Sequence, residues 1–140
     1  MQKPLEIYGL SNLKKWIEDE MTINIESELL KYKEKVKNLV QLTKTGDVIL
    51  KQTDLTAKQK ILVYLIGKTY SKVADYTQNE TATNKEIIET LGLPEGTVKN
   101  VLFDLRNEGI VNSLENGVHR IRVANIGLAL SKYFEGESKS

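Results

Sequence analysis

The sequence contains no cysteine among its 140 residues. This absence excludes disulfide bonds, thiolate metal ligands and cysteine nucleophiles, and it agrees with a reducing compartment such as the cytosol. The only histidine is His119. One histidine cannot build a metal site of ordinary ligand number, so we expect no bound metal.

Long hydrophobic runs are also missing. No apolar stretch approaches the roughly 18 residues that a membrane-spanning helix needs. Residues 1–6 (MQKPLE) lack the apolar core of a secretory signal peptide. We therefore expect a cytoplasmic protein without a membrane partner.

An excess of either charge is absent as well, because 20 basic residues face 19 acidic ones for a net charge of +1. Residues 53–134 alone carry ten basic and nine acidic side chains, again +1. A strongly basic chain would indicate a nucleic-acid partner by its bulk charge. Here any contacts to phosphate must come from local clustering.

Two helices are predicted in the N-terminal third, over residues 12–21 and 25–39. The second carries apolar side chains at alternating steps of four and three residues, which is a heptad seam. The seam residues are Ile25, Leu29, Tyr32, Val36 and Leu39. The seam covers only about two heptads, so it fits packing onto the protein's own core as well as a homodimer interface. The sequence leaves both alternatives, intramolecular packing and a homodimer interface, open.

Residues 40–51 alternate around a Thr-Gly-Asp turn and predict a small β-hairpin. Residues 52–54 form a short polar connector. We place a boundary there, between an N-terminal segment over residues 1–52 that supplies the possible dimer contacts and a second domain over residues 53–134.

The second domain has clear helix signals. Thr56 caps a helix that runs to Val73, and a polar loop covers residues 75–82. Thr83 opens the next helix with Glu86 at capping-box spacing, and Gly92 ends it.

A third helix follows, with Pro94 in its first turn and a stop at Gly109. A strand that begins at residues 110–111 and a second strand over residues 118–123 flank a hairpin turn at residues 115–117. A helix over residues 126–134 and a polar, disordered tail over residues 135–140 complete the prediction.

This order of helix, helix, tight turn, helix and β-hairpin resembles the winged helix-turn-helix family. The segment NKEIIETLGLPEGTV, residues 84–98, is similar to the family's helix-turn-helix core. Leu102, Leu105 and the Glu108 to Val111 segment are similar to the end of its recognition helix and its first wing strand. The sequence also resembles small archaeal proteins of similar layout. The expected fold is thus mainly α with small β-hairpins, a winged helix-turn-helix with an N-terminal helical extension.

The resemblance implies sequence-specific binding of double-stranded DNA by a regulator of transcription, with the third helix in the major groove. The residues that match the family's DNA-reading positions are Lys85, Thr97, Lys99, Asn100, Phe103, Arg106, Asn116, His119, Arg120 and Arg122. Lysine and arginine suit phosphate or guanine, and asparagine suits adenine. The wing arginines suit the DNA backbone or the minor groove.

Several residues depart from the family pattern. Val101 and Phe103 stand where polar or basic residues are usual, and the third helix sums to −1. We expect Val101 in the core. Phe103 fits either packing beneath the wing or exposure to DNA or protein. The alternative function is therefore a winged-helix module that bridges protein partners through the Phe103 face.

The wing residues could also be solvent-exposed without any functional contact. His119 is expected as a solvated wing residue, with phosphate contact as the other reading. Arg120 and Arg122 would be solvated on any antiparallel hairpin. No glycine-rich phosphate loop, histidine-containing triad or zinc-protease motif is present. We expect neither enzymatic activity nor a cofactor.

Overall fold

The computed structural model describes residues 12–115 and 117–135. Its fold is mixed α/β, with a two-stranded and a three-stranded antiparallel sheet among helices. The predicted wing residue Asn116 and the tail over residues 136–140 lie outside the described residues. Within the described residues, no helix has both the length and the apolarity to cross a bilayer.

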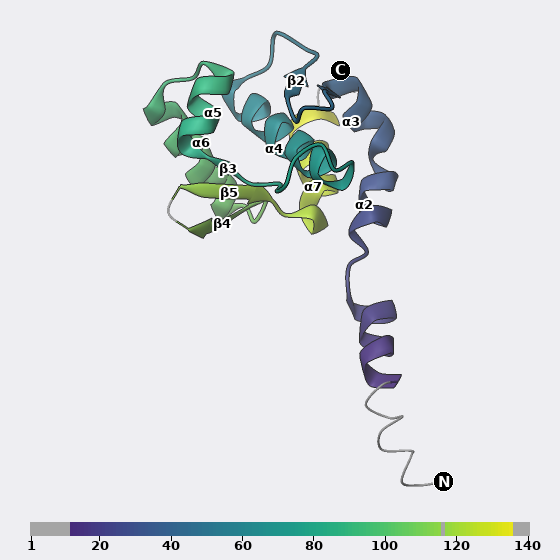
Figure 1. Cartoon of the computed structure of the whole chain (residues 1–140). Helices are drawn as coiled ribbons and strands as arrows, with labels where there is room; N and C mark the ends of the chain where they lie inside the picture. The colour runs from purple at the N-terminus through teal and green to yellow at the C-terminus, as the bar shows by residue number, and fades with distance from the viewer. Residues whose placement is uncertain (1–11, 116, 136–140) are drawn as a thin grey trace, which may run out of the picture.

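The central element is α4, Ala57–Val73, which lies between the other elements (Figure 1). It begins at a complete capping box, in which Thr56 accepts from the Gln59 backbone and the Gln59 side chain accepts from Thr56. Residues 61–69 are all buried. A helix that is apolar on most sides must be enclosed by its neighbours, and α4 is therefore the core of the fold.

One side of α4 is covered by α2 (Ile25–Lys31), α3 (Lys33–Leu39) and a hairpin of β1 (Val40–Leu42) and β2 (Val48–Leu50). The predicted hairpin is confirmed. The single helix predicted over residues 25–39 is wrong, because the chain breaks at Tyr32. The predicted connector lies at the surface, yet apolar residues on both sides of it share one hydrophobic core.

The heptad seam faces this core. Leu29, Val36 and Leu39 are buried within their own chain, and Tyr32 packs closely against Gly127. Ile25 stays half exposed. This corrects the assignment of the seam as a dimer interface, because its buried members cannot also face a second copy. A homodimer as such remains a prediction.

The other side of α4 is covered by α5 (Asn84–Leu91), α6 (Glu95–Asn107) and a sheet in the order β3-β5-β4. The strands are β3 (Ala82–Thr83), β4 (Val111–Glu115) and β5 (Val118–Ile121). The polar loop predicted over residues 75–82 is wrong at its end, because Ala82 is buried and pairs with His119.

The turn between α5 and α6 follows the predicted chemistry in part. Gly92 ends α5 in the left-handed region, at φ +67°. Thr83 accepts from the Glu86 backbone. The Glu86 carboxylate turns instead to Tyr64 and Lys68, so the second half of the capping box is missing. Pro94 is the N-cap of α6 and not a first-turn residue.

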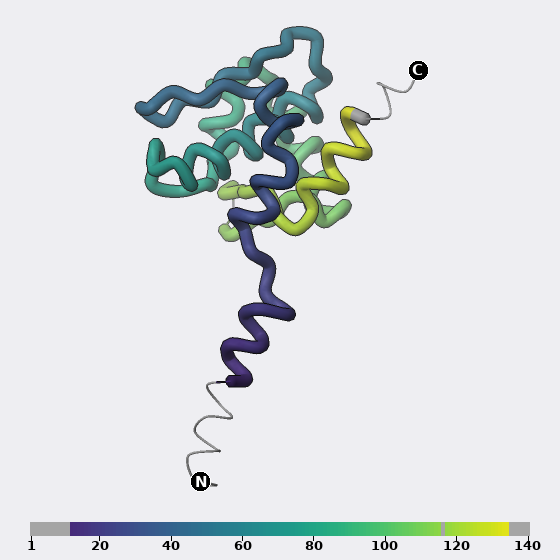
Figure 2. The backbone as a smooth tube through the Cα atoms, turned by 90° about the vertical axis from the view of Figure 1, so that its right-hand side faces the viewer, coloured from purple at the N-terminus to yellow at the C-terminus, as the bar shows by residue number. Residues whose placement is uncertain are grey.

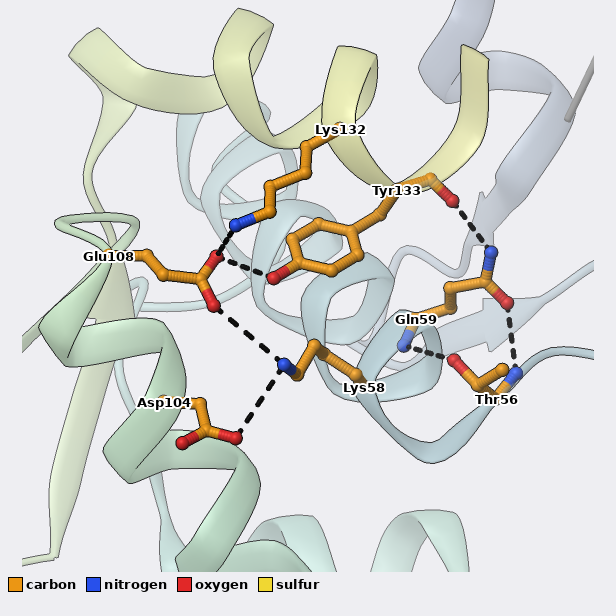
Figure 3. Close-up of polar contacts among 7 residues, drawn as sticks. All are labelled: Thr56, Lys58, Gln59, Asp104, Glu108, Lys132 and Tyr133. Carbon is orange, nitrogen blue, oxygen red and sulfur yellow. Dashed lines mark hydrogen bonds and ion pairs between the residues drawn. The ribbon is translucent and has the colours of Figure 1, made fainter. Parts of the chain in front are cut away.

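The C-terminal segment docks through the polar cluster in Figure 3. After η2 (Val123–Asn125), α7 (Ile126–Leu130) runs on into the π-turn η3 (Ser131–Glu135). Glu108 accepts from the Tyr133 hydroxyl at 2.5 Å and from Lys132 at 3.0 Å, while Lys58 lies 3.7 Å away. Burial raises the pKa of Glu108, but these contacts outweigh it and hold the pKa below its ordinary 4.5.

The N-terminal helix stands apart from the rest. Residues 12–16 are α-helical and continue into the π-turn η1, Ile17–Met21, and the helix projects away from the body (Figures 1 and 2). All of its described residues are exposed.

Candidate nucleic-acid interface

An open groove lies between α6 and the β4–β5 hairpin. The side chains of α6 that reach it include Lys99, Asn100, Phe103 and Arg106. Asn84 at the start of α5, with Ser113 and His119 from the hairpin, closes the opposite side. The groove therefore joins residues that are up to 35 positions apart in the chain.

The two faces of α6 differ sharply. Val98, Val101, Leu102 and Leu105 are buried, which confirms the predicted core face and the core position of Val101. Lys99, Asn100, Phe103 and Arg106 lie on the exposed face. Because the buried row fixes the helix on α4, the exposed row is held in a defined direction.

Phe103 is 55% exposed, so the reading in which it packs beneath the hairpin is wrong. Arg106 lies beside it, with its guanidinium carbon 5.9 Å from the centre of the Phe103 ring. A guanidinium at this distance from an aromatic ring is attracted to it, and this attraction restrains both side chains. Together they present a flat, cationic and apolar surface.

The charge of the α6 face is small. Lys99 pairs with Glu95 at 2.9 Å, one turn before it. Asp104 is 3.6 Å from Lys58, on the side away from the groove residues. Arg106 makes no ion pair within the described residues, so its charge is the one most available to an anionic ligand.

His119 is buried and not solvated, which corrects its predicted place. Its Nε2 lies 2.6 Å from Asn84 Oδ1 and its Nδ1 lies 2.7 Å from Ser113 Oγ. In this arrangement the neutral ring donates from Nε2 and accepts the Ser113 hydroxyl at Nδ1. The ring thus ties the hairpin to α5 and cannot reach phosphate without breaking both bonds.

Burial, and then the charge of Arg106, lower the pKa of His119 below its ordinary 6.5. A histidine with a lowered folded-state pKa stabilises the fold fully above pH 6.5, and that stability is lost as the pH falls below it. We expect the melting temperature to fall between pH 7.5 and pH 5, with a smaller fall in His119→Gln. Equal falls in both proteins would contradict this role of His119.

The hairpin arginines are not part of the groove. Side chains alternate between the two faces of a strand, and Arg120 pairs across the sheet with Asn112 while His119 pairs with Ser113. Arg120 therefore points away from the α6 side, where it pairs with Glu80 at 3.0 Å. Arg122 is exposed beside the same outer face. Arg120 and Arg122 therefore do not share a surface with the α6 groove residues, and their predicted contact with DNA stays a prediction.

The other predicted positions among the described residues, Lys85 and Thr97, do not line the groove. Lys85 is exposed in the first turn of α5, and Thr97 is half-buried in the first turn of α6. Asn84 and Ser113 were missed by the sequence reasoning. Ser113 could have been found, because residues 113 and 119 are equally distant from the turn at 116 and therefore face each other across the hairpin.

Within the described residues, no group of three or more histidine, aspartate or glutamate side chains gathers to hold a metal. Comparisons with protein-family models, with curated proteins and with solved structures gave no match.

Proposed function

We propose that this chain is a cytoplasmic winged helix-turn-helix protein that binds double-stranded DNA sequence-specifically and regulates transcription. The observation that carries the proposal is the exposed row of Lys99, Asn100, Phe103 and Arg106 on a helix whose opposite face is locked into the core. An α-helix with its side chains is about 10–12 Å wide and fits the major groove, about 12 Å wide.

Each member of the row suits a feature of DNA. Asn100 can form two hydrogen bonds to adenine, and we assign Arg106, which suits guanine or phosphate, to phosphate. Phe103 supplies an apolar surface for a thymine methyl group. Lys99 and Lys85 are placed to contact phosphate. The dipole of α5 adds to the contact at Lys85, because its positive end lies at the first turn.

We expect Lys99→Ala with Arg106→Ala to weaken duplex binding for all sequences. Three phosphate contacts, from Lys85, Lys99 and Arg106, give a slope of log affinity against log salt of about −2.7, at about 0.9 for each contact. The double variant should reduce the slope to about −0.9. Fluorescence anisotropy with a labelled duplex at several salt concentrations measures both quantities.

The matched control is Arg120→Ala with Arg122→Ala, which removes the same amount of positive charge from the other face of the hairpin. We expect this variant to keep affinity and slope. Equal losses in the two double variants would show that bulk charge and not the α6 face binds DNA.

A second candidate function is protein interaction through the same face. It is favoured by the 55% exposure of Phe103 and by the net charge of −1 over residues 95–108, which are α6 and its C-cap Glu108. Such an apolar anchor suits a protein partner, whereas negative charge opposes phosphate.

Phe103→Ala separates the two functions. We expect it to change the free energy of unfolding by less than about 0.5 kcal/mol, because the ring is exposed, and the melting temperature should therefore hardly move. It should weaken duplex binding by a modest factor. Unchanged duplex binding together with the loss of a captured protein partner would favour the second function.

A further inference from the structure

The N-terminal helix carries an exposed apolar stripe. Leu13, Trp16, Ile17 and Met21 follow helical spacing and are 39–69% exposed. Isolated helices of fewer than about 12–15 residues are marginal in water. A helix of this length with its stripe in solvent therefore needs a surface to cover it.

A matching apolar groove lies at the root of this helix. It is a hollow of about 540 Å³ between the start of α2, the end of α4 and the outer face of β5. Ile23, Ile25 and Val73 form its apolar wall and are each about half exposed. Contiguous exposed apolar surface of this kind marks an interaction site.

The charges at the two surfaces are complementary. The second half of the helix carries Glu18, Asp19 and Glu20, of which only Asp19 has a basic partner, Lys15, within the described residues. Lys72 and Arg122 line the groove and make no ion pair within the described part of the chain. Arg120 and Glu80, also in the lining, pair with each other, and Glu26 is the other acidic lining residue, so the lining carries a net charge of +1. Acidic residues on the helix thus meet basic residues in the lining.

We propose that residues 12–21 dock into this groove on a second copy of the chain, and that the two copies exchange helices reciprocally. The helix ends at Thr22, next to the groove residue Ile23, and projects away from the body of the protein (Figure 2). A two-fold axis near residues 22–24 lays each helix across the partner's groove.

The exchange satisfies both surfaces at once. A two-fold contact uses the same patch on each copy and closes without leaving a helix or groove unpaired. One helix in one groove falls short of the interface of about 1,200 Å² that a stable dimer needs, whereas two such contacts reach that order. Trp16 alone can bury about 150–250 Å². This assembly does not depend on what the α6 face binds.

Sedimentation equilibrium of the full chain tests the exchange, with Trp16, the only tryptophan, as a fluorescent reporter of burial. We expect a dimer whose Trp16 emission shifts to the blue as concentration rises. Trp16→Glu on the helix and Val73→Lys on the groove should each weaken dimerisation by about 30-fold or more. Ile49→Glu, an exposed apolar residue on β2, should not.

Mixing the two variants is the decisive step. In a mixed dimer, the intact helix of the Val73→Lys copy docks into the intact groove of the Trp16→Glu copy. In the other contact, the acidic side chain introduced at residue 16 faces the basic side chain introduced at residue 73. We expect dimers to return on mixing. Thermal melting first establishes that both variants fold.

Three results would overturn the exchange. The first is a monomer at high concentration, with Trp16 either exposed or buried against its own groove. The second is a dimer that Val73→Lys leaves intact. The third is a pair of variants that stay monomeric when they are mixed.

Discussion

Replacing Glu86 with alanine should lower the free energy of unfolding by about 3 kcal/mol. The Glu86 carboxylate accepts from the Tyr64 hydroxyl at 2.5 Å and pairs with Lys68 at 3.0 Å, and so joins α5 to α4. The Lys68 side chain is only 10% exposed. Its ammonium group would be left buried without a counter-charge, which is among the costliest changes in a protein interior. Urea denaturation measures the loss.

Two variants separate this effect from the loss of a surface carboxylate. Glu89→Ala removes an exposed acid from the same helix and should change stability by less than about 0.5 kcal/mol. Glu86→Ala combined with Lys68→Met removes the stranded charge and should recover much of the loss. If Glu86→Ala behaves like Glu89→Ala, the buried pair does not hold α5 in place.

Gly67→Ala should destabilise the protein by about 1–3 kcal/mol, although alanine is the better helix former by about 1 kcal/mol. A Cβ atom at residue 67 of α4 would lie 2.5 Å from Val48 Cγ1 and 3.1 Å from Val40 Cγ2. Both valines belong to the β1–β2 hairpin, which packs onto α4 at this glycine. The hairpin must move outward to admit the methyl group. Calorimetric melting gives the sign directly.

Gly96→Ala is the matched control, because a Cβ there meets nothing within 4 Å and the helix gains its propensity. It should stabilise the protein by up to about 1 kcal/mol. Val48→Ala removes the nearest obstacle, so Gly67→Ala should cost less in that background. A stabilising Gly67→Ala would mean that the hairpin does not rest on α4.

Local sequence signals were sufficient for most elements. Thr56, Thr83 and Gly92 mark helix ends by the hydrogen bonds and backbone freedom of single residues, and the structure places helix ends at all three. The β3 strand was missed, because two residues carry no periodicity. It exists only because β5 offers Ala82 an unpaired edge.

Tertiary contacts determine whether the heptad seam packs within the chain or against a second copy. The same apolar spacing serves a dimer or an intramolecular core, and only the presence of α4 beside it buries Leu29 and Val36. Tyr32, where the predicted helix breaks, packs against Gly127 of α7, which lies 95 positions later in the chain. No local pattern carries that information.

The candidate site, too, could be predicted from the sequence only in part. The exposed row on α6 is the complement of its apolar row, so the sequence predicts it. Which face of the hairpin meets α6 depends on packing. One local signal was overlooked, however: His119 has the same strand phase as buried Ile121, whereas Arg120 has the opposite phase. Alternation alone separates the histidine from the arginines.

Selection from a random duplex library at low salt is the most direct measurement of DNA recognition by α6. The wild-type chain should enrich a defined motif, and Asn100→Ala should lose the preference at one adenine-containing position while keeping its affinity for phosphate. Arg120→Ala with Arg122→Ala should enrich the wild-type motif. A library from which the wild-type chain retains no duplex at low salt would contradict the proposed function.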